Sequence, residues 1–336
     1  MLPRSFFTLL ASLVLVQSVD RASDRLGIPA PTAGTAFAQG EFEGDQHLGA
    51  TQLTVPVKEG SVRFAIIGDN GTGERRQYEV GQEMARFHET FPFDFVIMLG
   101  DNIYGGKSPA DFKRKFEDPY RSLLDSGVKF YASLGNHDDP NERFYKPFNM
   151  GGKRFYSFKN GKVEFFALDS NYMDAQQLNW LNRQLQDSNS TWKICYFHHP
   201  LYSEGRFHGP DTDLRHLLEP LLERYGVNVV FSGHEHVYER IRPQHGIYYF
   251  VLGNSGELRS HNLKRSAETA KGFDTDRAFM LIEIAGDELY FHTVTRTGET
   301  VDSGVLEKQK PLTSKSAPLY PSQRAMLRQG GASERA

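Results

Sequence analysis

The chain has 336 residues, enough for one large α/β domain or two modest ones. With 39% hydrophobic and 24% charged residues, its composition is that of a folded globular protein and excludes collagen-like or wholly disordered classes. The formal net charge of -3 gives no reason to expect nucleic acid as the main partner. Cys195 is the only cysteine, so an intramolecular disulfide and a cysteine-based metal cluster are excluded. It lies in an apolar run, and we interpret it as a core residue.

The N-terminal stretch differs from the rest of the chain. Arg4 precedes an apolar run over residues 6–16, which is too short to span a membrane and is typical of a signal-peptide core. Ala36-Phe37-Ala38 supplies an A-x-A cleavage pattern. The gap before it is long, so an earlier cut or an uncleaved membrane anchor stays open. We expect a signal peptide over residues 1–38 and an exported protein, periplasmic or secreted, with no stable membrane span after processing.

Residues 39–60 lack a clear hydrophobic period and are interpreted as a linker. From there, short apolar runs rich in β-branched and aromatic residues predict buried strands. These runs cover residues 62–67, 93–99, 129–134, 163–168, 192–197, 227–231, 247–252, 279–284 and 289–294.

Segments with helical spacing separate the early strands. They predict helices over residues 74–90, 108–126, 174–188 and 211–225. Strands that alternate with helices indicate a parallel sheet with right-handed crossovers. After Gly246 the helical spacing disappears, which indicates a mixed or antiparallel sheet. We expect two stacked sheets flanked by helices, and a polar, disordered tail over residues 307–336.

Metal-capable side chains follow five of the predicted strands. The five strand ends read Gly68-Asp69-Asn70-Gly71, Gly100-Asp101-Asn102-Ile103-Tyr104, Gly135-Asn136-His137-Asp138, His198-His199-Pro200 and Gly233-His234-Glu235-His236. One such turn alone is more often a plain turn than a ligand site. Because ligands of open α/β sheets bind outside the carboxyl ends of the strands, five in order predict one shared site.

In this order the motifs G-D-x-G, G-D-x-x-Y, G-N-H-D, H-x-P and G-H-x-H resemble those of the purple acid phosphatases, within the calcineurin-like metallophosphoesterases. The resemblance covers about residues 61–296. Tyr104 is its specific part, because the wider superfamily usually has no tyrosine ligand there. The resemblance implies an α/β fold, a four-layer αββα sandwich of two mixed β-sheets flanked by helices, forming a catalytic domain over residues 61–306.

The resemblance also implies a binuclear metal centre. Asp69, Tyr104 and His236 would hold Fe(III). The second, divalent metal (Fe, Zn or Mn) would take Asn136, His198 and His234, and Asp101 would bridge the two ions. His208 and His137 match histidines that contact the substrate phosphate. His208 is the candidate acid for the leaving oxygen, with His137 as its partner or alternative, and His199 takes a position that varies in the family.

The chemistry of these donors agrees with the implied metals. All are oxygen or nitrogen groups, which suit iron, manganese or zinc and not copper(I). A tyrosine binds as phenolate only beside a strongly charged ion, so a trivalent metal fits Tyr104. Asp69, Asp101, the Tyr104 phenolate and a bridging hydroxide balance all but about one of the positive charges of Fe(III) plus a divalent ion, which leaves a surplus that attracts phosphate.

We therefore expect a metal-dependent phosphatase that hydrolyses phosphomonoesters by attack of a metal-bound hydroxide. Two alternatives stay open: a phosphodiesterase acting on nucleotides or lipid headgroups, and a catalytically silent metal- or phosphate-binding protein. The expected partner is a small phosphoester. The sequence does not indicate the natural substrate, the divalent metal, the pH optimum or the oligomeric state.

Other polar residues are mostly interpreted as structural. Asp138 and Asp169 can orient histidines, but a role within their turns is favoured. The basic stretch 258–271 is interpreted as a solvated loop. Candidates for the substrate mouth are Tyr202, Glu204, Arg206, Tyr238, Arg240 and Asn254, although Tyr-Glu-Arg after His236 can simply brace a strand end. Histidines outside the motifs, interpreted as surface or packing residues, are His47, His88, His216, His245, His261 and His292.

Overall fold

The computed structural model describes residues 55–264 and 266–308. The predicted signal peptide, most of the predicted linker and the predicted tail beyond Lys308 lie outside these residues. The described chain begins at Val55, which is already buried in the hydrophobic core. Just after it, the backbone N–H groups of Val57 and Lys58 donate to the buried carboxylate of Glu283. This segment is therefore bonded to the folded domain.

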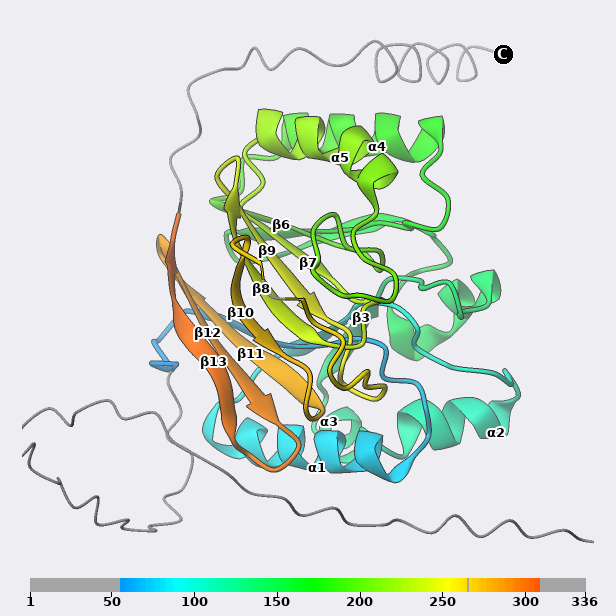
Figure 1. Cartoon of the computed structure of the whole chain (residues 1–336). Coiled ribbons are helices and arrows are strands. Elements are labelled where there is room, and N and C mark those ends of the chain that lie inside the picture. Colours follow the sequence, from blue (N-terminus) through cyan, green and yellow to red (C-terminus); the bar gives the residue numbers. More distant parts are fainter. Residues whose placement is uncertain (1–54, 265, 309–336) are drawn as a thin grey trace, which may run out of the picture. The chain divides into compact units, whose positions relative to one another are not determined.

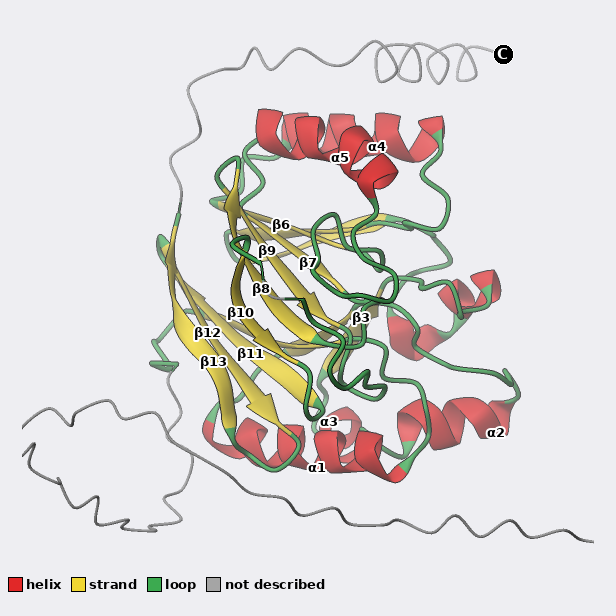
Figure 2. Ribbon diagram, in the orientation of Figure 1, coloured by secondary structure: helices red, strands yellow, loops and turns green. Residues whose placement is uncertain are grey.

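The described strands form two sheets, shown as arrows in Figures 1 and 2. The six-stranded sheet has the order β13 (Thr300–Glu307), β12 (Glu288–Thr295), β11 (Ala278–Ala285), β1 (Val62–Ile67), β2 (Phe95–Met98) and β3 (Lys129–Ala132). The seven-stranded sheet has the order β10 (Thr269–Phe273), β8 (Tyr238–Gln244), β9 (Ile247–Leu252), β7 (Val229–Ser232), β6 (Trp192–Tyr196), β5 (Val163–Ala167) and β4 (Tyr156–Asn160).

Both sheets are mixed. In the first, β1, β2 and β3 run parallel, and β11 pairs antiparallel with β1. In the second, β5, β6, β7 and β9 run parallel, while β4 and β8 are antiparallel to their neighbours. The parallel strands of each sheet bring their carboxyl ends to one edge, and the polar motifs follow these ends.

Helices cover the outer faces of the two sheets (Figure 2). Those beside the six-stranded sheet are α1 (Arg75–Thr90), α2 (Pro109–Phe112) and α3 (Arg121–Asp125). Those beside the seven-stranded sheet are α4 (Ala175–Asp187) and α5 (Thr212–Arg224). The leucines of α4 and α5 recur at helical spacing and form one buried cluster with Phe166 and Cys195, which confirms Cys195 as a core residue.

Aromatic side chains fill the space between the two sheets. The ring of Phe165 on β5 lies edge-on to Phe64 on β1, with 5.2 Å between centroids, and to Phe95 on β2, with 5.3 Å. All three are buried, and each such ring contributes about 1.5–3 kcal/mol by leaving water. The layers are therefore helix, sheet, sheet, helix, and the predicted αββα sandwich is confirmed.

The helix predicted over residues 108–126 is wrong as one continuous element. It divides into α2, a π-helical turn over Lys113–Glu117 and α3. Pro119 has no N–H to donate to the carbonyl of Lys115, and the side-chain amide of Gln77 donates to that carbonyl instead, at 2.5 Å. Asp118 N–H reaches back five residues to Lys113 O, at 2.8 Å, which widens the turn. Two short 3₁₀ turns follow β3, over Pro140–Phe144 and Lys146–Phe148.

The hydrophobic pattern missed four strands: β4, β8, β10 and β13. Their sequences carry charges, glycines or a proline, as in Tyr238–Gln244 and Thr300–Glu307, because each lies at or near a sheet edge. The predicted strands were otherwise found within two residues of their ends, and no helix follows Gly246 in the described part of the chain.

Candidate metal centre

The motif residues lie directly beyond the carboxyl ends of parallel strands. Asp69 follows β1, Asp101 follows β2, and His234 follows β7. All three have positive φ, at 51°, 52° and 69°, a region that non-glycine residues rarely adopt. Such strain persists only where the surrounding fold enforces it, and it concentrates at functional sites. It turns each side chain sharply out of its strand towards the others.

One group of donors gathers around the hydroxyl of Tyr104. This oxygen lies 3.0 Å from Asp101 Oδ2, 3.3 Å from Asp69 Oδ1 and 3.3 Å from His236 Nε2. His236 Nε2 is itself 3.3 Å from Asp69 Oδ1. Asp69, Asp101 and His236 are buried, so these four donors converge on one point shielded from water.

A second group gathers around His198. Its Nε2 lies 3.0 Å from Asn136 Oδ1, 3.1 Å from His234 Nδ1 and 3.5 Å from Asp101 Oδ2. Asp101 Oδ2 thus belongs to both groups, as a bridging carboxylate must. The structure brings all seven predicted ligand residues together, in the two sets of donors that the family pattern implies.

The centre is electrostatically unfavourable without cations. Burial and the neighbouring Asp101 charge raise the pKa of Asp69 well above its usual value. Burial, followed by the charges of Asp69 and Asp101, raises the pKa of the Tyr104 phenol. Burial and the nearby histidines lower the pKa of His234. Oxygen donors crowded together with neutral imidazole nitrogens fit hard or borderline cations.

His199 was not predicted as a ligand, yet it lies with the second group. The ligand-capable nitrogens of His198, His199 and His234 all lie within 4.8 Å of one another. Ser170 Oγ is 2.8 Å from His199 Nδ1 and orients the ring. The only sequence signal was the doublet His198-His199, in which the family pattern gives a role to the first member alone.

Backbone groups orient the donors. Leu99 O lies 2.9 Å from His198 Nδ1, which places the ring proton there and leaves the Nε2 lone pair facing the centre. His234 N–H donates to Asp69 Oδ2 and His137 N–H donates to Asp101 Oδ1, both at 2.9 Å. Asp69 and Asp101 each use one carboxylate oxygen for these backbone bonds, and the other oxygen of each faces the centre.

Asp138 joins two of the motif loops. Its carboxylate accepts the N–H groups of Asn102 at 2.7 Å, Ile103 at 3.1 Å and Gly135 at 2.8 Å. Asp169 forms an ion pair with Arg154 at 2.9 Å. Neither carboxylate is hydrogen-bonded to a histidine, so the structural role favoured for both is confirmed.

The two candidate acid histidines flank the two donor groups. The ring of His137 lies 5.0 Å from the Tyr104 ring, and the ring of His208 lies 3.9 Å from that of His234. Both are exposed at the mouth of the centre. Sequence reasoning missed the residue that holds His208: buried Glu235 accepts the N–H groups of His208 and Gly209, both at 2.6 Å.

Several residues proposed for the substrate mouth are structural. Tyr202 is buried and donates to Glu219 at 2.7 Å. Tyr238 and Arg240 both donate to Asp302, so this part of the motif braces the strand. Asn254 is buried and donates to Asp276 O.

A cavity of about 410 Å³ opens beside Asn136 and His199, at one flank of the centre. Its wall includes Asp138, Asp169 and Asp211, and no lysine or arginine lines it. This flank therefore has an acidic lining.

The remaining described histidines lie outside the centre, as predicted. His88 Nε2 lies 3.1 Å from Phe93 O, His292 is buried against Phe87, and His245 and His261 are exposed. His47 is outside the described residues.

Fold and site together define a two-metal phosphoesterase architecture. Residues 62–238, more than half of the chain, match the model of the calcineurin-like phosphoesterase family. The chain therefore belongs to this family.

Curated relatives narrow the class. The chain is 27% identical to a tartrate-resistant acid phosphatase type 5 of Oryctolagus cuniculus, over 66% of this chain and 82% of the relative. It is 29% identical to purple acid phosphatase 4 of Arabidopsis thaliana, over 71% of this chain and 82% of the relative. The chain is thus a purple acid phosphatase-like metallophosphoesterase, and the resemblance inferred from its motifs is confirmed.

Solved structures support the fold. GAP50, described as the anchor in the inner membrane complex of Plasmodium, matches with a TM-score of 0.67 and 21% identity, over 80% of this chain and 95% of that one. The purple acid phosphatase PPD1 from yellow lupin seeds matches with a TM-score of 0.55 and 19% identity, over 78% of this chain and 58% of that one.

Proposed function

We propose that this enzyme hydrolyses phosphomonoesters at a binuclear centre that holds one ferric and one divalent metal ion. Asp69, Tyr104 and His236 would hold a ferric ion. A divalent iron, zinc or manganese ion would be held by Asn136, His198 and His234, with Asp101 shared between the two.

One observation carries this proposal. A single oxygen, Asp101 Oδ2, lies 3.0 Å from the Tyr104 hydroxyl and 3.5 Å from His198 Nε2, so one carboxylate joins two otherwise separate donor sets. Two metal ions held by these sets would polarise phosphoryl oxygens and lower the pKa of bound water towards about 7. Tyr104 favours a trivalent ion on its side, because a phenol between two carboxylates loses its proton only to a strong positive charge.

The exposed histidines would serve the leaving group. His208 and His137 stand beside the two donor sets, where the ring nitrogens can reach a phosphoryl or leaving oxygen. Donation of a proton to the leaving oxygen by a positioned histidine typically contributes about 10²–10⁴-fold. Glu235, through the backbone N–H of His208, would hold that residue at the mouth.

The ferric assignment is tested by visible spectroscopy with metal analysis of the same sample. Iron-loaded protein under oxidising conditions should show a tyrosinate-to-iron absorption band, and Tyr104→Phe should abolish it. Tyr145→Phe is the control, because Tyr145 donates to Glu117 away from the centre. A colourless iron-loaded wild type would overturn the ferric assignment and favour a pair of zinc or manganese ions.

The ester class is tested with p-nitrophenyl phosphate and its bis ester. Faster turnover of the monoester supports the proposal, and a preference for the bis ester supports a phosphodiesterase. Protein with two bound metals per chain and no turnover of either ester would identify a silent metal-binding member of the family.

We propose further that the protein is exported. Support comes from Arg4, the apolar run over residues 6–16 and the Ala36-Phe37-Ala38 pattern. In the residues that the structure describes, no helix has the length and apolar character needed to cross a membrane. Sequencing the N-terminus of the protein recovered from culture supernatant or periplasm tests this, and an uncut N-terminus in the cytosol would overturn it.

A further inference from the structure

Arg259 forms part of the wall of the candidate centre. It lies in the loop between β9 and β10, where its N–H donates to His236 O at 3.0 Å and its Nε lies 3.4 Å from His236 Nδ1. Its guanidinium carbon is 3.3 Å from the centroid of the Phe207 ring. Phe207 is 61% exposed, and its ring packs on His208. Stacking on an aromatic face holds a guanidinium in place while leaving its edge free for hydrogen bonds.

The positive charge of Arg259 has no acidic partner in the described chain. None of the described ion pairs within 4.0 Å involves Arg259, Arg206 or Lys264. Arg154, on the other flank of the centre, is by contrast paired with Asp169. Unpaired cations beside a phosphoester centre are suited to bind an anion.

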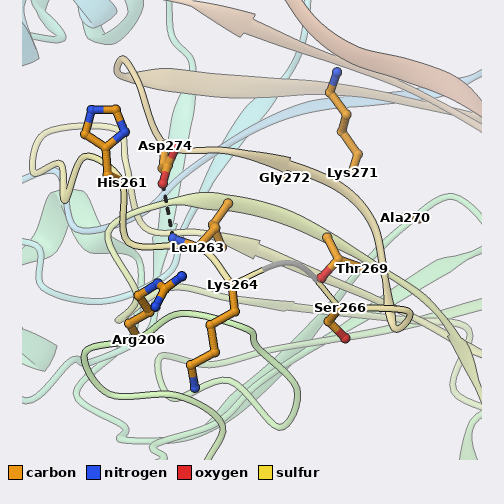
Figure 3. A pocket seen from close by; sticks show the side chains of 10 residues that line it. All are labelled: Arg206, His261, Leu263, Lys264, Ser266, Thr269, Ala270, Lys271, Gly272 and Asp274. Carbon is orange, nitrogen blue, oxygen red and sulfur yellow. Dashed lines mark hydrogen bonds between the residues drawn. The ribbon is translucent and has the colours of Figure 1, made fainter. Parts of the chain in front are cut away.

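Arg206 and Lys264 continue this positive surface away from the centre. Their two segments pair across an antiparallel bridge between Gly205 and Leu263, and Lys264 N–H donates to Glu204 O at 3.0 Å. Arg206 and Lys264 line a cavity of about 720 Å³, in which Lys271 points away from them and Asp274 binds the backbone of Leu263 (Figure 3). Phe207 directly follows Arg206, and Arg259 precedes Lys264 by five residues in the same loop.

The two flanks of the centre therefore differ in charge. Asp138, Asp169 and Asp211 line the cavity beside Asn136 and His199, and of these Asp169 is paired with Arg154. On the other flank Arg259 lies against His236 with Glu257 nearby, and Arg206 and Lys264 line the second cavity. An anionic leaving group would therefore be attracted more strongly at the second flank than at the first. We propose that Arg259, continued by Arg206 and Lys264, binds a second acidic group, so that the natural substrate is a phosphoester whose leaving group carries a further carboxylate or phosphate. This inference rests on the proposed function and names its substrate class.

Matched aryl esters test the proposal by kinetics. Phenyl phosphate is compared with 3- and 4-carboxyphenyl phosphate, which differ only by the added carboxylate. Wild type should prefer a carboxylated ester in kcat/KM, and Arg259→Gln should reduce that preference about tenfold, as loss of one charge-assisted hydrogen bond does. Lys162→Gln is the control: Lys162 is exposed in the turn before β5, at the opposite end of that strand from the centre. Lys162→Gln also removes one positive charge, and it should leave kcat/KM for phenyl phosphate and for the carboxylated esters unchanged.

Calorimetry gives a readout that needs no turnover. Metal-loaded protein is titrated with benzylphosphonate and with 4-carboxybenzylphosphonate. Wild type should bind the carboxylated compound more tightly, with a difference that shrinks as salt rises, and Arg259→Gln should remove the difference. The double variant Arg206→Gln, Lys264→Gln should lower it in part.

The outcomes separate the two proposals. Equal kcat/KM for the matched esters together with equal affinities for the phosphonates in wild type would overturn the second-anion site and leave the phosphatase proposal standing. A preference that survives in Arg259→Gln would also overturn it. Selective binding of the carboxylated phosphonate without hydrolysis of any ester would overturn the phosphatase proposal alone.

Discussion

Two kinds of buried carboxylate lie within the same few motif loops. Asp138 and Glu235 each accept hydrogen bonds from at least two backbone N–H groups. Asp69 and Asp101 accept one backbone N–H each within the motifs, and their other oxygens point at Tyr104 and His198. Asp138 and Glu235 thus have fixed backbone donors of their own, whereas Asp69 and Asp101 share the single Tyr104 hydroxyl and face histidine nitrogens, an arrangement that suits a cation.

This contrast separates carboxylates that hold the loops of the site in place from carboxylates that are free to bind metal. Asp138 and Glu235 hold loops in register, and the protein supplies all their partners. Asp69 and Asp101 sit in strained backbone at φ near 50° and are incompletely satisfied by the protein. The fold thus loses some stability at this edge of the sheets, because it holds these donors in strained backbone that faces an exogenous ligand.

Asp101→Asn should have the largest effect on activity. The substitution keeps the shape and suits the left-handed backbone at this position, but it removes the shared anionic donor. Because loss of an outer partner of a metal ligand already costs about 10–100-fold, loss of the bridging carboxylate should lower kcat by more than 100-fold and reduce bound metal to one ion or fewer. Steady-state kinetics and elemental analysis of the purified variant measure both.

Stability of the metal-free protein sharpens the same contrast. Removing one of two neighbouring buried charges should leave the midpoint of thermal unfolding of Asp101→Asn unchanged or raised. Asp302→Asn is the matched control: Asp302 has protein partners in Tyr238 and Arg240, so its variant should unfold at a lower temperature. If the two variants lost equal stability, the distinction between the two kinds of carboxylate would fail.

Glu235→Gln should have an intermediate effect. An amide in place of one oxygen faces the N–H of His208 or the side chain of Asn262, so the loop carrying His208 should shift. We expect a loss of about 1–3 kcal/mol in unfolding free energy and a fall in kcat of roughly tenfold. Urea unfolding and initial rates give the two values.

The control for Glu235 is Glu239→Gln. Glu239 is equally buried and accepts bonds from Ser203, Glu204 and Thr269; it lies on β8, just after the loop that carries Glu235. Its variant should lose similar stability with a smaller loss of kcat. If Glu235 acts through His208, combining Glu235→Gln with His208→Ala should lower kcat by less than the product of the single effects. Multiplicative losses would contradict that role.

The strands and the site followed from the sequence for the same reason. Strands β2 and β9 are continuous apolar runs, and β1 and β6 are nearly so, because both of their faces are mostly buried; the polar residues that follow mark where each strand leaves the core. Strands at or next to a sheet edge, such as β13 and β8, are partly exposed and carry charges, so no hydrophobic pattern marks them. The break in the helix predicted over residues 108–126 was missed because Pro119 lies within a run whose hydrophobic spacing favours a helix.

What could not be predicted were contacts between loops distant in sequence. Arg259 reaches His236 through a loop that the sequence marked only as basic, and Glu235 meets His208 from a neighbouring strand end. Side chains between two motif histidines carry no periodic signal, so only the fold reveals their partners. The contact between His199 and His234 is also one between loops distant in sequence, so it could not be predicted.

His292→Gln should have the smallest effect on activity and shows that an unsatisfied buried group need not be functional. His292 is buried on β12 with Nε2 bonded to Thr300 Oγ1, while Nδ1 has no hydrogen-bond partner in the described structure. Burial lowers the pKa of this imidazole from 6.5 to about 4. The unfolded chain therefore binds a proton on His292 more readily than the folded chain does. Above pH 6.5 this residue costs the folded state nothing, and as the pH falls from 6.5 towards 4 the free energy of unfolding should decrease by roughly 3 kcal/mol.

Urea unfolding of metal-free protein at pH 7 and pH 4.5 should show a smaller loss of stability for His292→Gln than for wild type. Substitution of exposed His245 by Gln should leave the wild-type values at both pH values unchanged. An equal loss in wild type and His292→Gln would show that other groups control acid sensitivity, and a fall in kcat for His292→Gln at pH 7 would show that the two ends of the sheet are coupled.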